Sequence, residues 1–163
     1  MPSDVFLKID GVEGESNDSK HKGEIEVLSF SWGVTQAITG TVSSSGTFSG
    51  QRCDMSALSI QKLFDKASPK AAQACAAGDH FASAVLTLCR AGGDKQPYIE
   101  YKLSDVMISS VQVGGAGEGG VPTESWSLHY AKIEQTYTQI GLDGKPAGKG
   151  ASVGWDLKEN KKV

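Results

Sequence analysis

The sequence predicts a mostly β fold with one short α-helix. Several segments alternate apolar and polar residues, which is the period of a half-buried strand. A single alanine-rich run, bordered by Ser-Pro and by Gly, is typical of a short helix. The 20 glycines among 163 residues suit a protein of strands and turns. We expect a single domain over residues 1–163, because this length is sufficient for one hydrophobic core.

The first strand is expected over residues 4–10, and the clearest alternation follows at 24–36, EIEVLSFSWGVTQ. Its large side chains share one face and its small ones share the other: Leu28, Phe30, Trp32 and Val34 against Ser29, Ser31 and Gly33. We expect Leu28, Phe30 and Trp32 on the large face to be buried, since burying three such side chains contributes several kcal/mol at roughly 25 cal/mol per Å².

Residues 37–50, AITGTVSSSGTFSG, are interpreted as a long excursion within this domain, because too little chain precedes them for an independent one. The segment around 55–64 fits a strand or a helix, and we favour a strand ending near Phe64. Ser68 and Pro69 are then predicted as the N-cap and the first helical residue. The run KAAQACAA continues the helix, and Gly78 ends it in the left-handed conformation.

The remainder of the chain is predicted as strand, at 84–90, 98–113, 126–137 and 152–157. In residues 98–113 the apolar residues switch between odd and even positions near Ser104-Asp105 and again near Ser109-Ser110. Residues 126–137 show the same kind of switch. A change of phase inside one extended run indicates bulges or sharp bends. Long strands that bend in this way fold one sheet into a barrel, or turn the corner between two packed sheets.

The motifs that could carry chemistry are weak. Residues 115–120 match GxGxxG, but Pro122 and an alternating strand follow where a dinucleotide site needs a helix, so a hairpin loop is expected. The three cysteines are odd in number and lack CxxC spacing, which indicates reduced, buried thiols. The three histidines are scattered, and the acidic residues of 13–26 lack EF-hand spacing. We therefore expect no catalytic site, no metal site and no cofactor.

Composition excludes further classes of partner. The net charge of −3 argues against a general nucleic-acid or polybasic membrane role. No signal peptide and no stretch long enough to span a membrane is recognised, so the chain is expected to fold in the cytoplasm without stable membrane insertion. Trp32, Trp126 and Trp155 each lie in an alternating strand, which favours core packing over a carbohydrate platform.

Seven segments in this order resemble the Hcp family, the inner-tube proteins of bacterial type VI secretion systems: ESND, EIEVLSFSWG, SPKAAQACAAG, LCRAGG, YKLSDVMISSV, ESWSLHY and GWDLKEN. The resemblance extends from about Asp4 to the end of the chain. It implies a β-barrel formed by two antiparallel sheets with one short flanking α-helix, a fold shared with phage tail-tube proteins. It also implies a structural, non-enzymatic role as a homohexameric ring.

The resemblance further implies that rings stack into a tube that a sheath expels, with a spike protein at its tip and a baseplate at its root. The lumen of such a ring holds small effector proteins, and the tube leaves the cytoplasm without a cleaved signal peptide. In the family the strand EIEVLSFSWG lines the lumen, so Ser31 and Ser29 are expected to contact an effector. The family's extended loop corresponds to 37–49, which makes five residues candidates for ring stacking: Thr39, Thr41, Ser43, Ser45 and Thr47.

Two other interpretations remain open. One is a phage or prophage tail-tube protein of the same fold. The other is an unrelated β-sandwich binding module, for example for a glycan, which we expect to be a monomer with ligand-dependent melting.

Overall fold

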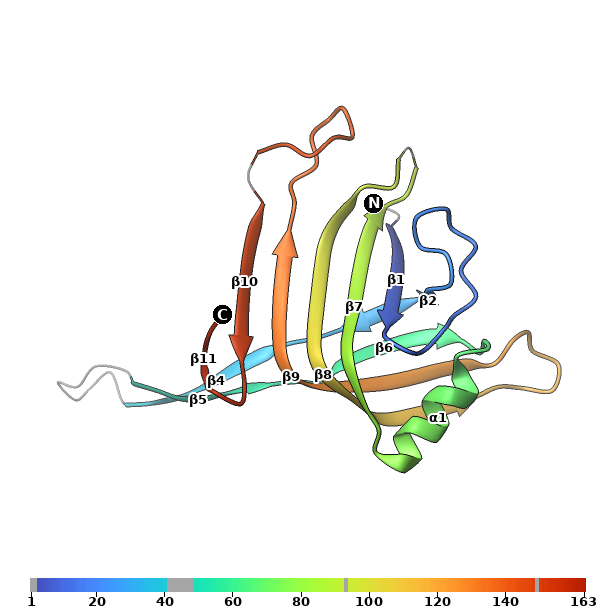
Figure 1. Ribbon diagram of the computed structural model, residues 1–163, viewed down its shortest axis with the longest axis horizontal. Helices are drawn as coiled ribbons and strands as arrows, with labels where there is room; N and C mark the ends of the chain where they lie inside the picture. The colour runs from blue at the N-terminus through green and yellow to red at the C-terminus, as the bar shows by residue number, and fades with distance from the viewer. Residues whose placement is uncertain (1–2, 41–48, 93, 149) are drawn as a thin grey trace.

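The computed structural model describes residues 3–40, 49–92, 94–148 and 150–163 (Figure 1). In chain order the elements are β1 (Ser3–Ile9), β2 (Ile25–Val27), β3 (Ser29–Ser31), β4 (Val34–Thr39), β5 (Ser49–Met55), β6 (Leu58–Leu63), α1 (Ser68–Ala77), β7 (His80–Arg90), β8 (Pro97–Gly114), β9 (Thr123–Tyr137), β10 (Ala151–Asp156) and β11 (Lys161–Lys162). The predicted fold class, mostly β with one short helix, is confirmed.

Nine of these strands form one antiparallel sheet that folds into two layers. The first layer has the order β11-β10-β9-β8-β7-β1-β2, and the second consists of β3, β6 and the other halves of β9 and β8. Figure 1 shows the first layer upright and the second crossing beneath it, as in orthogonal packing. Strands β4 and β5 pair only with each other among the described strands. Pairing among the described strands does not close into a complete barrel, because β2 and β11 end the first layer.

Strands β8 and β9 pass through both layers, and their bends lie where the change of phase predicted them. Asp105 has a φ of 53° and is skipped in the pairing, since Ser104 lies opposite Lys132 and Val106 lies opposite Tyr130. The register shifts a second time between Ile108 and Ser110. Because extra residues twist and bend a strand, these irregularities turn the chain from one layer into the other.

The core lies between the two layers. Its fully buried members include Leu7, Leu58, Leu86, Leu103 and Trp126. Trp32 and Trp155 are partly buried and pack against this core, so all three tryptophans take part in packing, as predicted.

The prediction for residues 24–36 is only partly correct, because this segment is not one strand with one buried face. Ile25 and Val27 are buried, whereas Leu28 is 61% exposed and Val34 is 50% exposed. A bend at Leu28 separates β2 from β3 and reverses the phase. Only Phe30 and Trp32 of the predicted large face turn inward, and the Tyr101 ring centroid lies 5.9 Å from that of Phe30 and 5.7 Å from that of Trp32.

Helix α1 flanks the sheet and packs on β8. Its end is as predicted, since Gly78 has a φ of 69° and the amide of Asp79 donates to the carbonyl of Ala74 at 3.0 Å. The predicted N-cap is wrong: Ala67 occupies this position, and the helix begins at Ser68. The hydroxyl of Ser68 instead contacts Oε2 of Glu124 at 2.6 Å, because this buried carboxylate lies directly beside it.

The glycine-rich residues 115–120 form the connection of the β8–β9 hairpin, as expected from the residues that follow them. The segment 37–49 is described only at its two ends, and both ends belong to the β4–β5 hairpin. No helix among the described residues is both long enough and apolar enough to cross a membrane.

Candidate functional site

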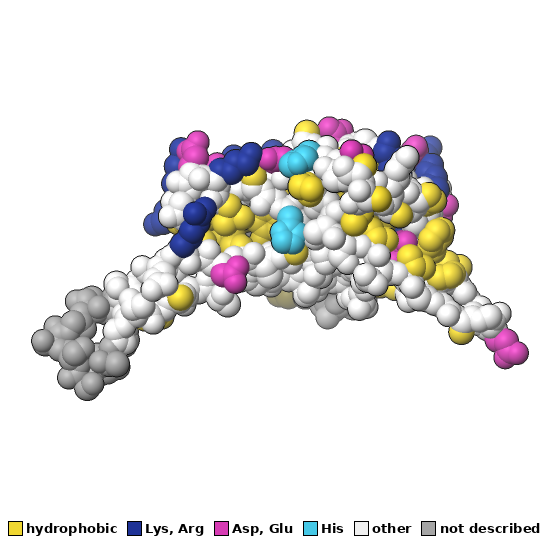
Figure 2. Space-filling view, turned by 90° about the horizontal axis from the view of Figure 1, so that it is seen from below, with side chains coloured by type: hydrophobic (Ala, Val, Ile, Leu, Met, Phe, Trp, Pro, Cys, Tyr) yellow, Lys and Arg dark blue, Asp and Glu magenta, His cyan; other side chains and the backbone are white. Residues whose placement is uncertain are grey.

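The outward face of the second layer is a continuous surface of small, uncharged polar side chains. The strand registers align these side chains in two rows, Ser31–Ser59–Ser127–Ser110 and Ser29–Gln61–Ser125–Gln112. All eight are exposed or partly exposed. We call this surface the serine face. Figure 2 views the molecule from the side of this layer, where charged side chains gather mainly along one margin.

The eight side chains of the serine face are uncharged, and two ionisable residues of its central strands point the other way. Lys62 of β6 and Glu124 of β9 are fully buried behind it, with Nζ and Oε2 3.0 Å apart. Lys62 also donates to Oδ1 of Asp65 at 2.9 Å and to the carbonyl of Leu63 at 2.7 Å. Since a buried ammonium is costly unless its donors are satisfied, this network allows a lysine to occupy the inner face.

Both predicted effector-contacting residues lie on this surface. Ser29 and Ser31 are exposed on β3, and the hydroxyl of Ser29 donates to Oε1 of Gln61 at 3.3 Å. The other six residues of the serine face were not predicted. The alternation in ALSIQKL and ESWSLHY indicates that their polar residues point outward. The alignment of β6, β9 and β8 with β3, however, depends on the strand registers, which alternation alone does not give.

One of the predicted ring-stacking residues can be placed. Thr39 is exposed at the end of β4, and its Oγ1 lies 3.0 Å from Oγ of Ser49 on β5. The remaining four, Thr41, Ser43, Ser45 and Thr47, lie outside the described residues. The described part of the β4–β5 hairpin extends away from the body on the side opposite the β8–β9 hairpin (Figures 1 and 2).

One cysteine lies close to a histidine, with Sγ of Cys89 3.4 Å from Nε2 of His21 and Nδ1 of His21 2.9 Å from Oε2 of Glu24. Such an order of groups can activate a nucleophile. Here, however, burial and then the negative charges of Asp18, Asp4 and Glu24 raise the pKa of the Cys89 thiol. A catalytic thiol needs the opposite shift. The contacts instead fasten the loop before β2, where His21 also stacks on Phe6 with ring centroids 4.4 Å apart.

Within the described ranges, no group of three or more His, Cys, Asp or Glu side chains is arranged to hold a metal ion.

Comparison with known proteins identifies the family. The family model described as "Type VI secretion system effector, Hcp" matches residues 6–137. Protein hcp1 of Pseudomonas aeruginosa is 36% identical over 161 residues, which cover 98% of each chain. A solved type six secretion system protein superposes with a TM-score of 0.94 at 37% identity, covering 99% of this chain and all of the other. Hcp1 from Salmonella typhimurium gives a TM-score of 0.81 at 32% identity, with both chains fully covered.

These matches confirm the predicted resemblance and do not favour the tail-tube or glycan-binding interpretations. The chain belongs to the Hcp family of the type VI secretion system, whose members are secreted structural tube proteins and not enzymes.

Proposed function

We propose that six copies of this chain close into a ring, that rings stack into the tube of a type VI secretion system, and that the serine face lines its lumen. The observation that carries the lumen assignment is the double row of uncharged polar side chains. Each contact that such a surface forms is weak, and the total binding free energy depends on how many contacts form. This suits a compartment that holds a folded effector and then releases it.

The partners follow from this proposal. The tube is assembled in the cytoplasm, is driven outward by a sheath from a baseplate with a spike at its tip, and reaches the medium or a target cell without cleavage of a signal peptide. Small effector proteins travel inside it. No cofactor and no nucleic acid take part.

Ring formation is tested by native mass spectrometry of the purified protein across micromolar concentrations. We expect a mass of six subunits, and negative-stain images of the same sample are expected to show rings. A spectrum of single subunits only, over the whole concentration range, contradicts the proposed ring.

Replacing Ser31 with glutamine is expected to abolish protection of a cognate effector while hexamers still form. The longer side chain projects from an exposed position of β3, so it narrows the lumen without entering the core. We expect Ser31→Gln to weaken the effector complex at least about tenfold, which corresponds to a loss of about 1.4 kcal/mol of binding free energy. Effector levels in the producing cell are measured by immunoblot, with Ser152→Gln on exposed β10 as the matched control. Unchanged effector levels with Ser31→Gln contradict the assignment of the serine face.

Replacing residues 39–49 with an Asn-Gly turn is expected to leave hexamers intact but to stop tube assembly and secretion. The two-residue turn joins Ile38 to Gly50, which already lie opposite each other, so the pairing of the remaining hairpin is preserved. Hexamers are measured by native mass spectrometry and secretion by immunoblot of the medium. Normal secretion of this variant rules out a stacking role for the segment.

A further inference from the structure

The place of Ser29 and Ser31 in the serine face depends on how β6 pairs with β9. Among the described strands, β3 pairs only with β6, and β6 in turn pairs with β9. The bends of β8 and β9 fix how these two strands pair with each other, whereas β6 pairs with β9 continuously from Leu58 to Leu63. A different register between β6 and β9 therefore moves both serines along the serine face.

The outward side chains of β6 and β9 do not select one register. A shift of one residue is disfavoured, because it turns the polar side chains into the core. A shift of two residues, about 7 Å along the strand, keeps them outward and again places small or uncharged groups opposite each other. The outward pairs in the observed register are Ser59 with Ser127, Gln61 with Ser125, and Leu63 with Thr123.

Two of the three inward pairs are apolar and do not select a register either. Leu58 lies opposite Leu128, and Ile60 lies opposite Trp126. All four side chains are buried. Because hydrophobic attraction has no preferred direction, a shifted register in which Leu58 meets Trp126, or Ile60 meets Leu128, is also compatible with an apolar core. These residues hold β6 on the sheet without fixing its position along β9.

The third inward pair is specific. Lys62 lies opposite Glu124, with Nζ and Oε2 3.0 Å apart and both side chains buried. A shift by two residues brings Trp126 or Pro122 opposite Lys62 and leaves the Glu124 carboxylate in the core without this ammonium. Because a buried charge that loses its partner is strongly destabilising, both shifted registers are disfavoured.

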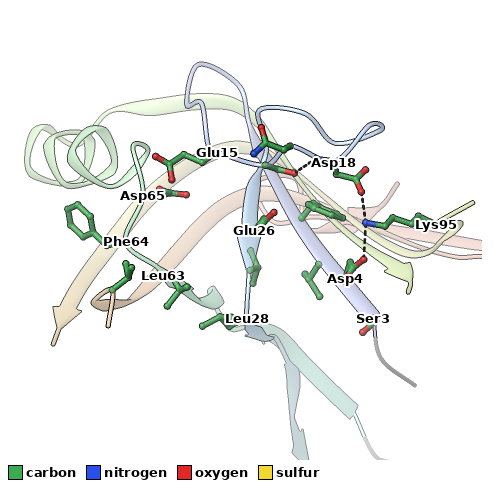
Figure 3. A pocket seen from close by; sticks show the side chains of 16 residues that line it. Ser3, Asp4, Glu15, Asp18, Glu26, Leu28, Leu63, Phe64, Asp65 and Lys95 are labelled. Atoms are coloured by element: carbon green, nitrogen blue, oxygen red, sulfur yellow. Dashed lines mark hydrogen bonds and ion pairs between the residues drawn. The ribbon is translucent and has the colours of Figure 1, made fainter. Parts of the chain in front are cut away.

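Two donors for Glu124 are held together by β6, α1 and the loop between them. Asp65 lies in this loop, on the wall of a groove of about 640 Å³ (Figure 3). Its Oδ1 accepts from Nζ of Lys62 at 2.9 Å, and its amide donates to Oγ of Ser68 at 3.0 Å. Nζ of Lys62 and Oγ of Ser68 both donate to Oε2 of Glu124, at 3.0 and 2.6 Å. Glu124 is the sole carboxylate among residues 123–133, so these donors match one position of β9.

We infer that Lys62 and Glu124 are positioning residues for the serine face: their buried pair fixes the register of β6 on β9 and thereby places Ser29 and Ser31 in line with the serines of β9 and β8. Selection of one register is the best-attested use of a buried polar group. The link to effectors rests on the proposed function, whereas the register itself is measured without an effector.

The register is measured by disulfide formation between cysteines placed on the outward face. Ser59→Cys is combined with Ser127→Cys for the observed register, and with Ser125→Cys or His129→Cys for a shift of two residues in either direction. Directly opposite residues come close enough for a disulfide, whereas diagonal ones are about 7–8 Å apart. The disulfides are mapped by mass spectrometry of the folded fraction from size-exclusion chromatography. In the otherwise unchanged protein, we expect the first pair to form at least about tenfold more disulfide than the others.

Lys62→Met with Glu124→Leu is expected to reduce this preference to less than about threefold, because all three inward pairs are then apolar. Glu124→Gln is expected to retain it, because the glutamine oxygen accepts from Nζ of Lys62 and from Ser68 at the same place. The matched control is Lys66→Met with Glu13→Leu, which removes an exposed pair 3.3 Å apart and is expected to change nothing. A tenfold preference that persists in the variant without Lys62 and Glu124 overturns the inference.

Glu124→Leu alone provides the second test if that double variant does not fold. Lys62 then keeps Oδ1 of Asp65 and the carbonyl of Leu63 as acceptors, at 2.9 and 2.7 Å, and these move together with β6. The same reduction of the preference is expected. An unchanged preference in the folded fraction of this variant also overturns the inference.

Protection of a cognate effector is measured by immunoblot in the same variants without the added cysteines. We expect protection to be lost with Lys62→Met and Glu124→Leu together, and to be retained with Glu124→Gln and with the surface control. Unfolding in urea is measured alongside, so that a loss caused by the register is distinguished from a loss of stability. A double variant that adopts shifted registers and still protects the effector normally overturns the proposed lumen role of the serine face, while the assignment of the register stands.

Discussion

Replacing Lys62 with methionine is expected to lower the free energy of unfolding by about 3–5 kcal/mol. Lys62 is fully buried, and its Nζ lies 3.0 Å from the equally buried carboxylate of Glu124. Without the ammonium, Glu124 keeps the Ser68 hydroxyl at 2.6 Å, and its Oε1 already lacks a partner among the described residues. A carboxylate left in this position has lost the charge that compensates its desolvation.

The double replacement Lys62→Met with Glu124→Leu is expected to recover most of this loss, because two apolar side chains of similar size remove both charges together. Lys66→Met is the control: Lys66 pairs with Glu13 at 3.3 Å on the surface, and such pairs contribute about 0–1 kcal/mol. Unfolding in urea is compared at one protein concentration, since subunit association adds to apparent stability. A loss below about 1 kcal/mol in the single variant shows that the buried pair is not required.

The alternation of apolar and polar residues was sufficient to predict most strands and the positions of the bends. Asp105 and the Ser109-Ser110 pair marked the changes of phase, and the chain turns between layers at these places. The same reasoning failed at Leu28. Leucine there fits the alternation with Phe30, yet the chain turns its side chain outward, so the side chain follows a local bend between β2 and β3 that the pattern does not encode.

The serine face was predicted only in part, for a related physical reason. Ser29 and Ser31 were visible as the small side of one strand, but the rows across β6, β9 and β8 depend on strand registers set by the bends. The pairing of Lys62 with Glu124 was equally hidden, since 62 residues separate them in the chain. Lysine and glutamate ordinarily predict a solvated face. Here they lie inside, and this inward placement keeps both charges away from the serine face.

Replacing Trp126 with alanine is expected to cost about 3–5 kcal/mol of stability. Trp126 is fully buried between Ser125 and Ser127 of the serine face, and its ring centroid lies 4.8 Å from Nζ of Lys62. The cavity left by the indole therefore removes support from both the buried ion pair and the strand that carries these serines. We expect protection of the effector to fall together with stability in this variant.

Trp126→Phe separates the contribution of the ring from that of the indole nitrogen. Nε1 of Trp126 is buried and makes no hydrogen bond within the described residues, so removing this unpaired donor offsets part of the lost volume. Phenylalanine also keeps an aromatic face toward Lys62. We expect a loss of less than about 1.5 kcal/mol and near-normal effector protection. Equal losses of stability for alanine and phenylalanine in urea unfolding would contradict this prediction, because they would show that a phenyl ring does not replace the packing of the indole.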